Sequence, residues 1–312
     1  MNYVLDHWSV DPFLIIAIVL AIWHEVGLAR LASGHGPDLS VPDLAGPDIS
    51  GPDQPGTDWT SRRRRRSLLF YAGLVVMLLA VQSPIQYWSR DYFFVHMIQH
   101  LLLMFAAPSL IVAAAPWQPL VAALPKRAGP VMTAAWSRPL RATGGLLARP
   151  WVSVALFSVV MVIWHLPGPL DLAERNQAVQ IWLMHTSFLI AGVLFWLQFI
   201  PSPPFRIRIT AMFQALALLA TNCVMWVLAM AMGFLTSGSW YSVYNHIPGV
   251  TLPAFADQQI GAGILWICGD FWAIPTMVFV IKKLLAEDGG VSTAVDRMLG
   301  RGSARFNWAN RG

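Results

Sequence analysis

The chain has 312 residues, of which 56% are hydrophobic and only 12% are charged, and its mean hydropathy is +0.55. This composition is typical of a membrane protein and excludes an ordinary soluble domain. The net charge of +5 does not indicate a nucleic-acid partner, because most basic residues lie on one side of the predicted membrane.

Seven apolar segments are candidates for transmembrane helices, since a run of roughly 18 or more apolar residues can span a bilayer. The fourth segment is the shortest, because Pro167 and Pro169 follow it. The segments cover residues 12–31, 67–85, 92–115, 150–165, 178–200, 209–235 and 257–281. We therefore predict an all-α polytopic integral membrane protein with about seven transmembrane helices and no soluble catalytic module.

The first apolar segment is not typical of a cleaved secretory signal. Asp6 and Asp11 precede it where a signal carries positive charge. The next segment repeats a Pro-Asp pair every five residues, which predicts disorder. The four predicted regions are a first transmembrane helix (1–32), a disordered cytoplasmic linker with an Arg block (33–66), a six-helix membrane core (67–283) and a basic cytoplasmic tail (284–312).

The basic residues predict the orientation of the helices. All of the 21 Lys and Arg residues except Arg90 and Arg175 follow odd-numbered predicted helices. Because cytoplasmic loops carry an excess of Lys and Arg, we predict that the N-terminus lies outside and the C-terminus in the cytoplasm. The chain is then a multi-pass membrane protein, and the lipid bilayer is one of its expected partners.

Two histidines in the third predicted helix are the first candidates for a functional site. His96 and His100 are four residues apart, so both rings lie on one helix face, and Met104 follows one turn further along. His165 closes the fourth predicted helix and His185 lies two turns into the fifth. In the predicted orientation all of these side chains lie in the outer half of the membrane.

Clustered imidazoles and thioethers favour a soft or borderline metal ion, with copper ahead of zinc. The alternative is structural, because a histidine in a spanning helix can instead hydrogen-bond a neighbouring helix, and methionines commonly fill cores. Four further residues, Cys223, Cys268, Asp270 and Glu25, lie in or near spans without an assigned role. The cysteines lack the spacing of a thiolate metal site.

Four blocks of this sequence together resemble the CtaG family of caa(3)-type cytochrome c oxidase assembly factors. They are HMIQHLLLMFAAPSLIVAAAP from residue 96, WHLPGPLDLA from 164, His185 with AGVLFW from 191, and DQQIGAGILW from 257. The resemblance covers residues 67–283 and leaves out the Pro-Asp repeat and the tail. Leu265 stands where relatives often have Met.

The resemblance implies a polytopic bacterial cell (inner) membrane protein that is needed to form active oxidase and is thought to deliver copper to the haem-copper centre of subunit I. Six residues fall on family positions: His96, His100, His165, His185, Asp257 and Gln258.

We therefore expect a non-enzymatic oxidase assembly factor that binds Cu(I). In this hypothesis His96 and His100 hold the ion with a third donor from His165, His185 or Met104, and Asp257 and Gln258 serve as entry or supporting residues. The expected partners are oxidase subunit I and a possible copper donor protein. Two alternatives stay open. Facing histidines can ligate haem iron, and a metal-free scaffold for assembly fits the same fold.

Overall fold

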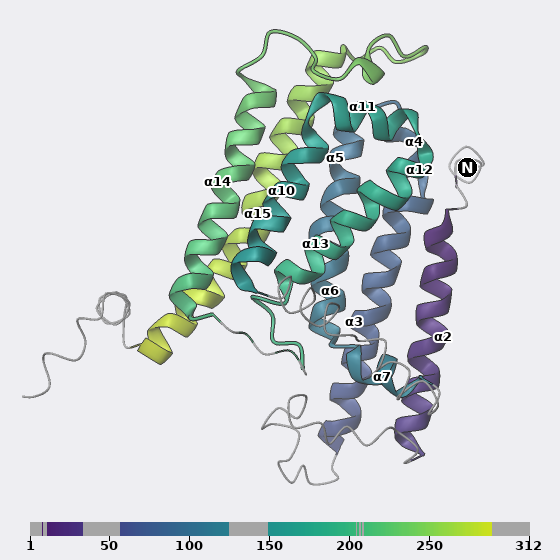
Figure 1. Cartoon of the computed structure of the whole chain (residues 1–312), viewed down its shortest axis with the longest axis vertical. Coiled ribbons are helices and arrows are strands. Elements are labelled where there is room, and N and C mark those ends of the chain that lie inside the picture. The colour runs from purple at the N-terminus through teal and green to yellow at the C-terminus, as the bar shows by residue number, and fades with distance from the viewer. Residues whose placement is uncertain are drawn as a thin grey trace, which may run out of the picture.

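The computed structural model describes residue 8 and residues 11–33, 57–124, 149–203, 205, 207 and 209–288. Within these residues the regular elements are all helices, and the long ones run side by side as a bundle (Figure 1). Six helices are long and apolar enough to cross a membrane, and there are seven such spans if the bent pair Pro150–His165 and Pro167–Arg175 is taken as one span. The predicted all-α polytopic fold is confirmed.

Several spans are built from consecutive helical segments. Their bounds are α2 (Pro12–Ala32), α3 (Thr57–Gln82) with α4 (Pro84–Trp88), α5 (Phe93–Leu101) with η1 (Leu102–Ala106) and α6 (Ala107–Ala114), α10 (Pro150–His165) with α11 (Pro167–Arg175), α12 (Gln177–Val179) with η2 (Gln180–His185) and α13 (Thr186–Trp196), α14 (Ala211–Gly233), and α15 (Ala254–Asp288). Two short helices lie outside the spans, α7 (Trp117–Ala122) and the 3-10 helix η3 (Ser242–Tyr244).

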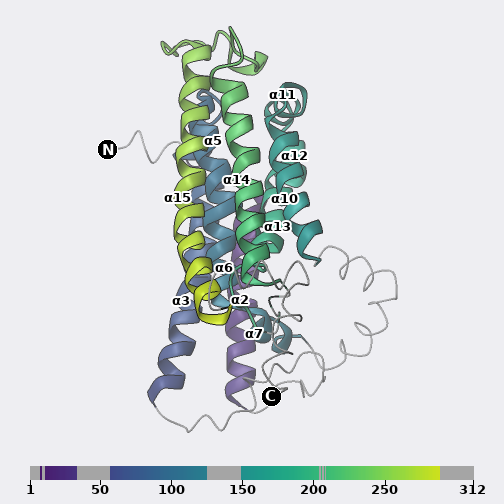
Figure 2. The ribbon, with the colours of Figure 1, turned by 90° about the vertical axis from the view of Figure 1, so that its left-hand side faces the viewer.

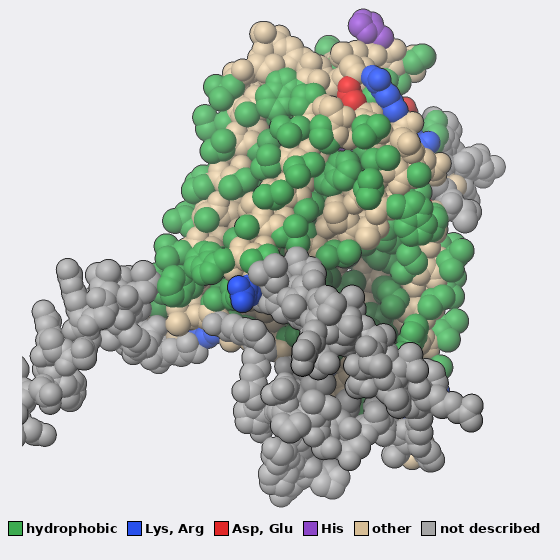
Figure 3. All heavy atoms as spheres, in the orientation of Figure 1, with side chains coloured by type: hydrophobic (Ala, Val, Ile, Leu, Met, Phe, Trp, Pro, Cys, Tyr) green, Lys and Arg blue, Asp and Glu red, His purple; other side chains and the backbone are tan. Residues whose placement is uncertain are grey.

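The span formed by α5, η1 and α6 is the most buried of the bundle. Helices α14 and α15 pack against each other along their length, as both ribbon views show (Figures 1 and 2). Helix α11 and the segment around η3 lie at one end of the bundle, here called the α11 end, and α7 lies at the opposite, α7 end (Figure 1). Between the two ends the visible surface is a broad apolar band (Figure 3), as a lipid-facing surface requires.

Helix α3 begins ten residues earlier than the apolar pattern predicted. The predicted span started at residue 67, whereas α3 starts at Thr57 and includes Arg62 to Arg66. Arginine has a high helix propensity, so a basic block can extend a helix beyond the apolar core. The predicted linker therefore ends by residue 56, and its Pro-Asp repeat lies outside the described residues, as does the tail beyond residue 288.

The fourth span is broken by its prolines. Helix α10 ends at His165, Leu166 is extended, and α11 leaves at 72° to α10. A residue before proline is disfavoured in the helical region, which explains why the break falls at Leu166. The bend turns α11 back across the α11 end of the bundle and so brings its acidic side chains over the histidines.

Candidate functional site

Four histidines, from three spans, lie together in the half of the bundle near the α11 end. The ring centroids of His96 and His100 are 4.1 Å apart, and those of His100 and His165 are 5.3 Å apart. His185 lies within electrostatic interaction range of His96 and His100. All four side chains are at most 4% exposed. We call them the histidine cluster.

Most ring nitrogens of the histidine cluster lack a hydrogen-bond partner among the described residues. They are Nε2 of His165 and both nitrogens of His96, His100 and His185, although His96 Nδ1 also lies within ion-pair distance of Glu174. A buried polar atom without a partner costs free energy, so native structures rarely contain several of them together. Such a set of orphaned nitrogens makes the histidine cluster a candidate site for a ligand.

The Nδ1 atoms of two histidines face oxygen atoms. His165 Nδ1 donates to the Met161 carbonyl at 2.6 Å. His96 Nδ1 lies 3.0 Å from Glu174 Oε1 in an ion-pair contact, and the Glu174 side chain is only 5% exposed. An oxygen partner at one ring nitrogen fixes the orientation of the ring and leaves the other nitrogen for a ligand, as is usual around metal-binding histidines.

Glu174 is held in turn by a row of buried glutamines. Gln180 Nε2 donates to Glu174 Oε1 at 2.7 Å, and Gln86 Nε2 donates to Gln180 Oε1 at 3.2 Å. Gln99 closes the row by donating to Gln86 Oε1 and to the Ala80 carbonyl. The carboxylate beside His96 is therefore positioned by α11, η2, α4 and α5 together.

Two π-helical segments adjoin the histidine cluster. Segment η1 begins two residues after His100, and η2 ends at His185. Pro108 accounts for η1, because proline has no N–H to bond the Met104 carbonyl and its ring pushes that carbonyl away. In η2 the Thr186 hydroxyl donates to the Ile181 carbonyl at 3.1 Å. π-Helical turns within helices occur frequently at functional sites.

Aromatic side chains cover the histidine cluster on the side of the α11 end. The ring centroids of Phe93 and Tyr241 are 4.5 Å apart, and that of Tyr244 lies 6.5 Å from that of His96. Tyr241 donates its hydroxyl to the His165 carbonyl at 2.8 Å. Burial raises the pKa of Tyr241 and of Tyr244 above its ordinary value, so both phenols stay protonated and donate.

Asp171 fixes the segment that carries these tyrosines. Its carboxylate accepts from the backbone N–H of Ser242 at 3.2 Å and of Val243 at 3.4 Å, and from the Ser242 hydroxyl. Helix α11 therefore anchors η3, and with it the aromatic cover of the histidine cluster.

The spacing that made Met104 a candidate assumed a regular α-helix. Met104 is buried, but it lies within η1, where the helix is wider than the α-helix that the prediction assumed. Its stacking one turn beyond His100 therefore does not follow, and a role as ligand stays a prediction.

Asp257 and Gln258 bond the backbone near the cluster. Asp257 caps α5 by accepting from the N–H groups of Phe93 and Phe94 at 2.7 and 2.9 Å. Gln258 accepts from the Trp240 N–H and donates to the Met232 carbonyl. The geometry gives both residues a supporting function, because they fix α5 and the segment that leads to Tyr241.

The rings of the cluster are not arranged around a single point. Within the part of the chain that the structure describes, no three His, Cys, Asp or Glu side chains are placed so that they could hold a metal ion. Imidazole nitrogens are donors that suit a soft or borderline ion. The rings as they are placed here do not form a coordination site for such an ion. Rotation of the imidazoles about their side-chain bonds is required to bring three nitrogens to one ion.

Sequence reasoning missed Glu174, the glutamines and the two tyrosines. The available signal for Glu174 was its position, because it directly follows the WHLPGPLDLA block and lies four residues, or about one helical turn, after the apolar Leu170. The glutamines gave none, because each lies alone in its own segment.

Comparison with known proteins identifies the family of the chain. The family model described as cytochrome c oxidase caa3 assembly factor (Caa3_CtaG) matches residues 54–287. The chain belongs to this family. The matched residues include every described member of the histidine cluster and the residues that support it. The family's description names an assembly factor and not an enzyme.

Two curated relatives of this family member are the uncharacterized protein Mb0105 of Mycobacterium bovis and the uncharacterized protein MT0111 of Mycobacterium tuberculosis. Each is 24% identical over 246 residues, which are 74% of this chain and 36% of the relative. The chain thus spans about a third of the length of these relatives. No solved structure matches the chain.

Proposed function

We propose that this CtaG-family protein binds Cu(I) at the histidine cluster and assists its insertion into the haem-copper centre of cytochrome c oxidase subunit I. The observation that supports the proposal is the set of orphaned ring nitrogens on four buried histidines. Imidazole binds copper well, and an ion at this position removes the cost of burying those nitrogens without partners. Copper is the cargo of such a protein and not a cofactor for catalysis.

In this proposal His96 and His100 are the first ligands and either His165 or His185 supplies a third nitrogen. Glu174 holds His96 and places a negative charge beside a monovalent cation. The aromatic cover formed by Phe93, Tyr241 and Tyr244 excludes water from that side. The partners are subunit I and a copper donor protein, and the setting is the bacterial cell membrane. Ligand exchange with subunit I releases the ion.

The experiment is a competition titration of the purified 312-residue chain with a Cu(I) chelator, in the wild type and in the variants His96→Ala and His100→Ala. We expect each variant to lose Cu(I) retention and to stay folded, because each change removes unsatisfied buried ring nitrogens and, in His96→Ala, Glu174 keeps its hydrogen bond from Gln180. His24→Ala is the matched control, since His24 is equally buried but lies on α2, near the α7 end. His35→Ala, outside the described residues, is a second control.

Wild-type copper stoichiometry in both cluster variants, together with restored oxidase activity in a deletion strain, would exclude the metal site and support a metal-free scaffold. The haem alternative has its own readout, a Soret band in the reduced-minus-oxidised spectrum.

A further inference from the structure

Helix α15 carries a heptad pattern of apolar side chains on its outer face. With residue 264 as position a, its a and d positions are all apolar, and they are Ile264, Ile267, Phe271, Ile274, Val278, Ile281 and Leu285. Six of these seven side chains are at least 43% exposed. An apolar a and d pattern that continues over about three heptads is typical of a helix that packs against another helix as in a coiled coil. We call these seven positions the α15 seam.

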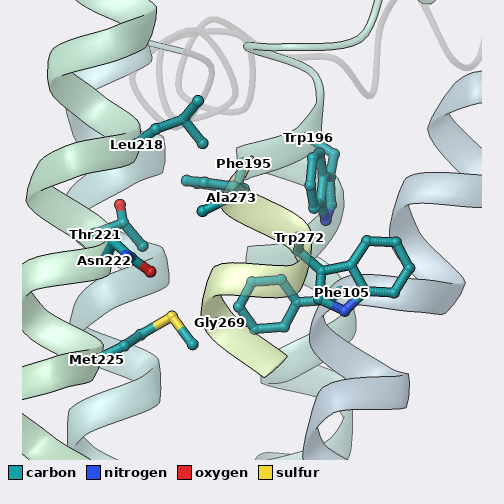
Figure 4. Close-up of a pocket in the computed structure, with 10 residues that line it drawn as sticks. All are labelled: Phe105, Phe195, Trp196, Leu218, Thr221, Asn222, Met225, Gly269, Trp272 and Ala273. Carbon is teal, nitrogen blue, oxygen red and sulfur yellow. The ribbon is translucent and has the colours of Figure 1, made fainter. Parts of the chain in front are cut away.

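The opposite face of α15 is already packed. Gly269, Trp272 and Ala273 line a small cavity together with Asn222 of α14 (Figure 4). An added Cβ at Gly269 would lie 2.6 Å from Met225 Cε, so α14 and α15 are in close contact there. Among the spans that the structure describes, α15 is nevertheless the least buried, and Figure 2 shows it at one edge of the bundle.

A carboxylate flanks the α15 seam in the middle of the membrane. Asp270 occupies position g, beside Phe271, and lies at the centre of the span Ala254–Leu285. It is partly exposed. Its Oδ1 accepts from Asn222 Nδ2 at 2.8 Å and from Trp226 Nε1 at 3.1 Å, whereas its Oδ2 accepts no hydrogen bond from a described residue.

The second oxygen of Asp270 needs a donor that the described helices do not supply. No ion pair joins Asp270 to a basic side chain within them. A carboxylate at this depth is costly, and it normally pairs with another polar or charged group. Lipid chains have no donor to offer. In a coiled coil, however, residues at position g form ion pairs with the partner helix, so a helix on the α15 seam can bring the missing donor.

A second copy of the chain does not bring that donor. Two copies related by an axis along the membrane normal pack their α15 helices in parallel, and a g residue then faces an e residue of the other helix. The e positions next to Asp270 are Cys268 and Pro275, and neither carries a positive charge. Charge complementarity therefore favours a different protein, one with a basic side chain at this depth.

We propose that the α15 seam is the docking surface for a transmembrane helix of oxidase subunit I that carries a Lys or Arg side chain at the depth of Asp270. The identity of this partner rests on the proposed function, whereas the seam and its carboxylate do not. Helix α15 also packs against α5, which carries His96 and His100. A helix docked on the seam is thus separated from the histidine cluster by α15 alone.

Photo-crosslinking in the membranes of the host cell tests this docking surface, with p-benzoylphenylalanine at position 274 of the chain and an epitope tag on subunit I. Ile274 on the α15 seam is 61% exposed, and Ile18 on α2, which is 50% exposed, is the matched control position. We expect the crosslink to subunit I to be several-fold stronger from position 274 than from position 18. Equal crosslinking from both positions, no crosslink from position 274, or a crosslink to a second copy of the chain would overturn the proposal.

The variants Asp270→Asn and Asp270→Glu test the charge, with the same crosslinker at position 274. Asparagine keeps an oxygen that can accept from Asn222 and Trp226, so the contact of α14 with α15 is retained and only the charge is lost. We expect Asp270→Asn to lower the crosslink to subunit I several-fold and Asp270→Glu to keep it. An unchanged crosslink in Asp270→Asn would show that no basic side chain pairs with this carboxylate. Cu(I) retention should stay at the wild-type level in both variants, so a failure of docking is distinguishable from a failure of the proposed copper site.

Discussion

At the scale of single residues, the carboxylate beside His96 is the feature that favours the proposed metal site over four histidines that only pack together. The Glu174 side chain is almost fully buried. Its carboxylate is held in position by a hydrogen bond from the side-chain amide of Gln180. An acid buried at this cost needs a partner charge. In the proposed function, the cation bound at the histidine cluster supplies that charge.

The variant Glu174→Gln tests this role. Glutamine keeps the shape and can still accept from Gln180, so the fold is retained and only the charge is lost. Supporting carboxylates of this kind commonly contribute about 10–100-fold to metal affinity, and we expect a loss of Cu(I) affinity in that range by chelator competition. Glu25→Gln, on α2 near the α7 end, is the control. An unchanged affinity in Glu174→Gln would show that the carboxylate serves only the packing of α11.

The sequence predicted the four histidines as candidates, and Asp257 and Gln258 as supporting residues through the family resemblance, but not Glu174 or the row of buried glutamines. His96 and His100 were found because two imidazoles at helical spacing in an apolar segment are costly. The position of Glu174 beside His96 depends on the bend of 72° between α10 and α11. The prolines predict that a bend occurs, but they do not predict its direction. The glutamine row joins four segments that are far apart in the chain, and periodicity within one segment carries no information about such contacts.

At the scale of elements, the apolar pattern predicted the spans well and their internal geometry poorly. The fourth predicted segment, 150–165, has the same bounds as α10. The third segment was treated as one α-helix, yet it contains η1, because Pro108 removes one backbone donor. The wider turn changes the register after Leu101, so the α-helical spacing that suggested a stripe from His100 to Met104 no longer supports it, and the role of Met104 stays a prediction.

Gly192 permits the close contact between α13 and η1. An added Cβ there would lie 2.5 Å from the Met104 carbonyl oxygen and 2.7 Å from Pro108 Cγ. We expect Gly192→Ala to push the two spans apart and to lower the free energy of unfolding by about 1–3 kcal/mol, the usual cost of overpacking. Unfolding of the purified protein in a denaturing detergent measures this effect.

The control for Gly192→Ala is Gly263→Ala within α15. An added Cβ at Gly263 meets nothing within 4 Å, so alanine should be neutral or should stabilise the helix by about 0.5–1 kcal/mol. Equal stabilities of the two variants would contradict a tight contact between α13 and η1. Because His185 precedes α13 directly, Gly192→Ala should also weaken Cu(I) retention.

At the scale of the whole molecule, the bundle places two kinds of chemistry at opposite ends. Arg30 and Arg63 lie near the α7 end, where Arg30 Nη1 donates to the carbonyls of Ala123 and Leu124 at 2.7 and 2.8 Å and Arg63 Nη2 to that of Leu28 at 2.6 Å. The histidine cluster lies towards the α11 end with Arg175. The described helices thus carry most of their basic side chains at the end away from the histidines.

This separation predicts the direction in which the protein faces. Cytoplasmic ends of membrane helices carry the excess of Lys and Arg, so the α7 end should be cytoplasmic and the histidine cluster should lie in the outer half of the membrane. A reporter fused after Gly312 is expected to be cytoplasmic, and one inserted after Gly249, between η3 and α15, is expected to be external. Paired phosphatase and fluorescent-protein fusions at both positions measure this, since the first is active only outside and the second only inside. A C-terminal fusion with external phosphatase activity would reverse the orientation and place the histidine cluster in the cytoplasmic half, where copper could reach it only from the cytoplasmic side.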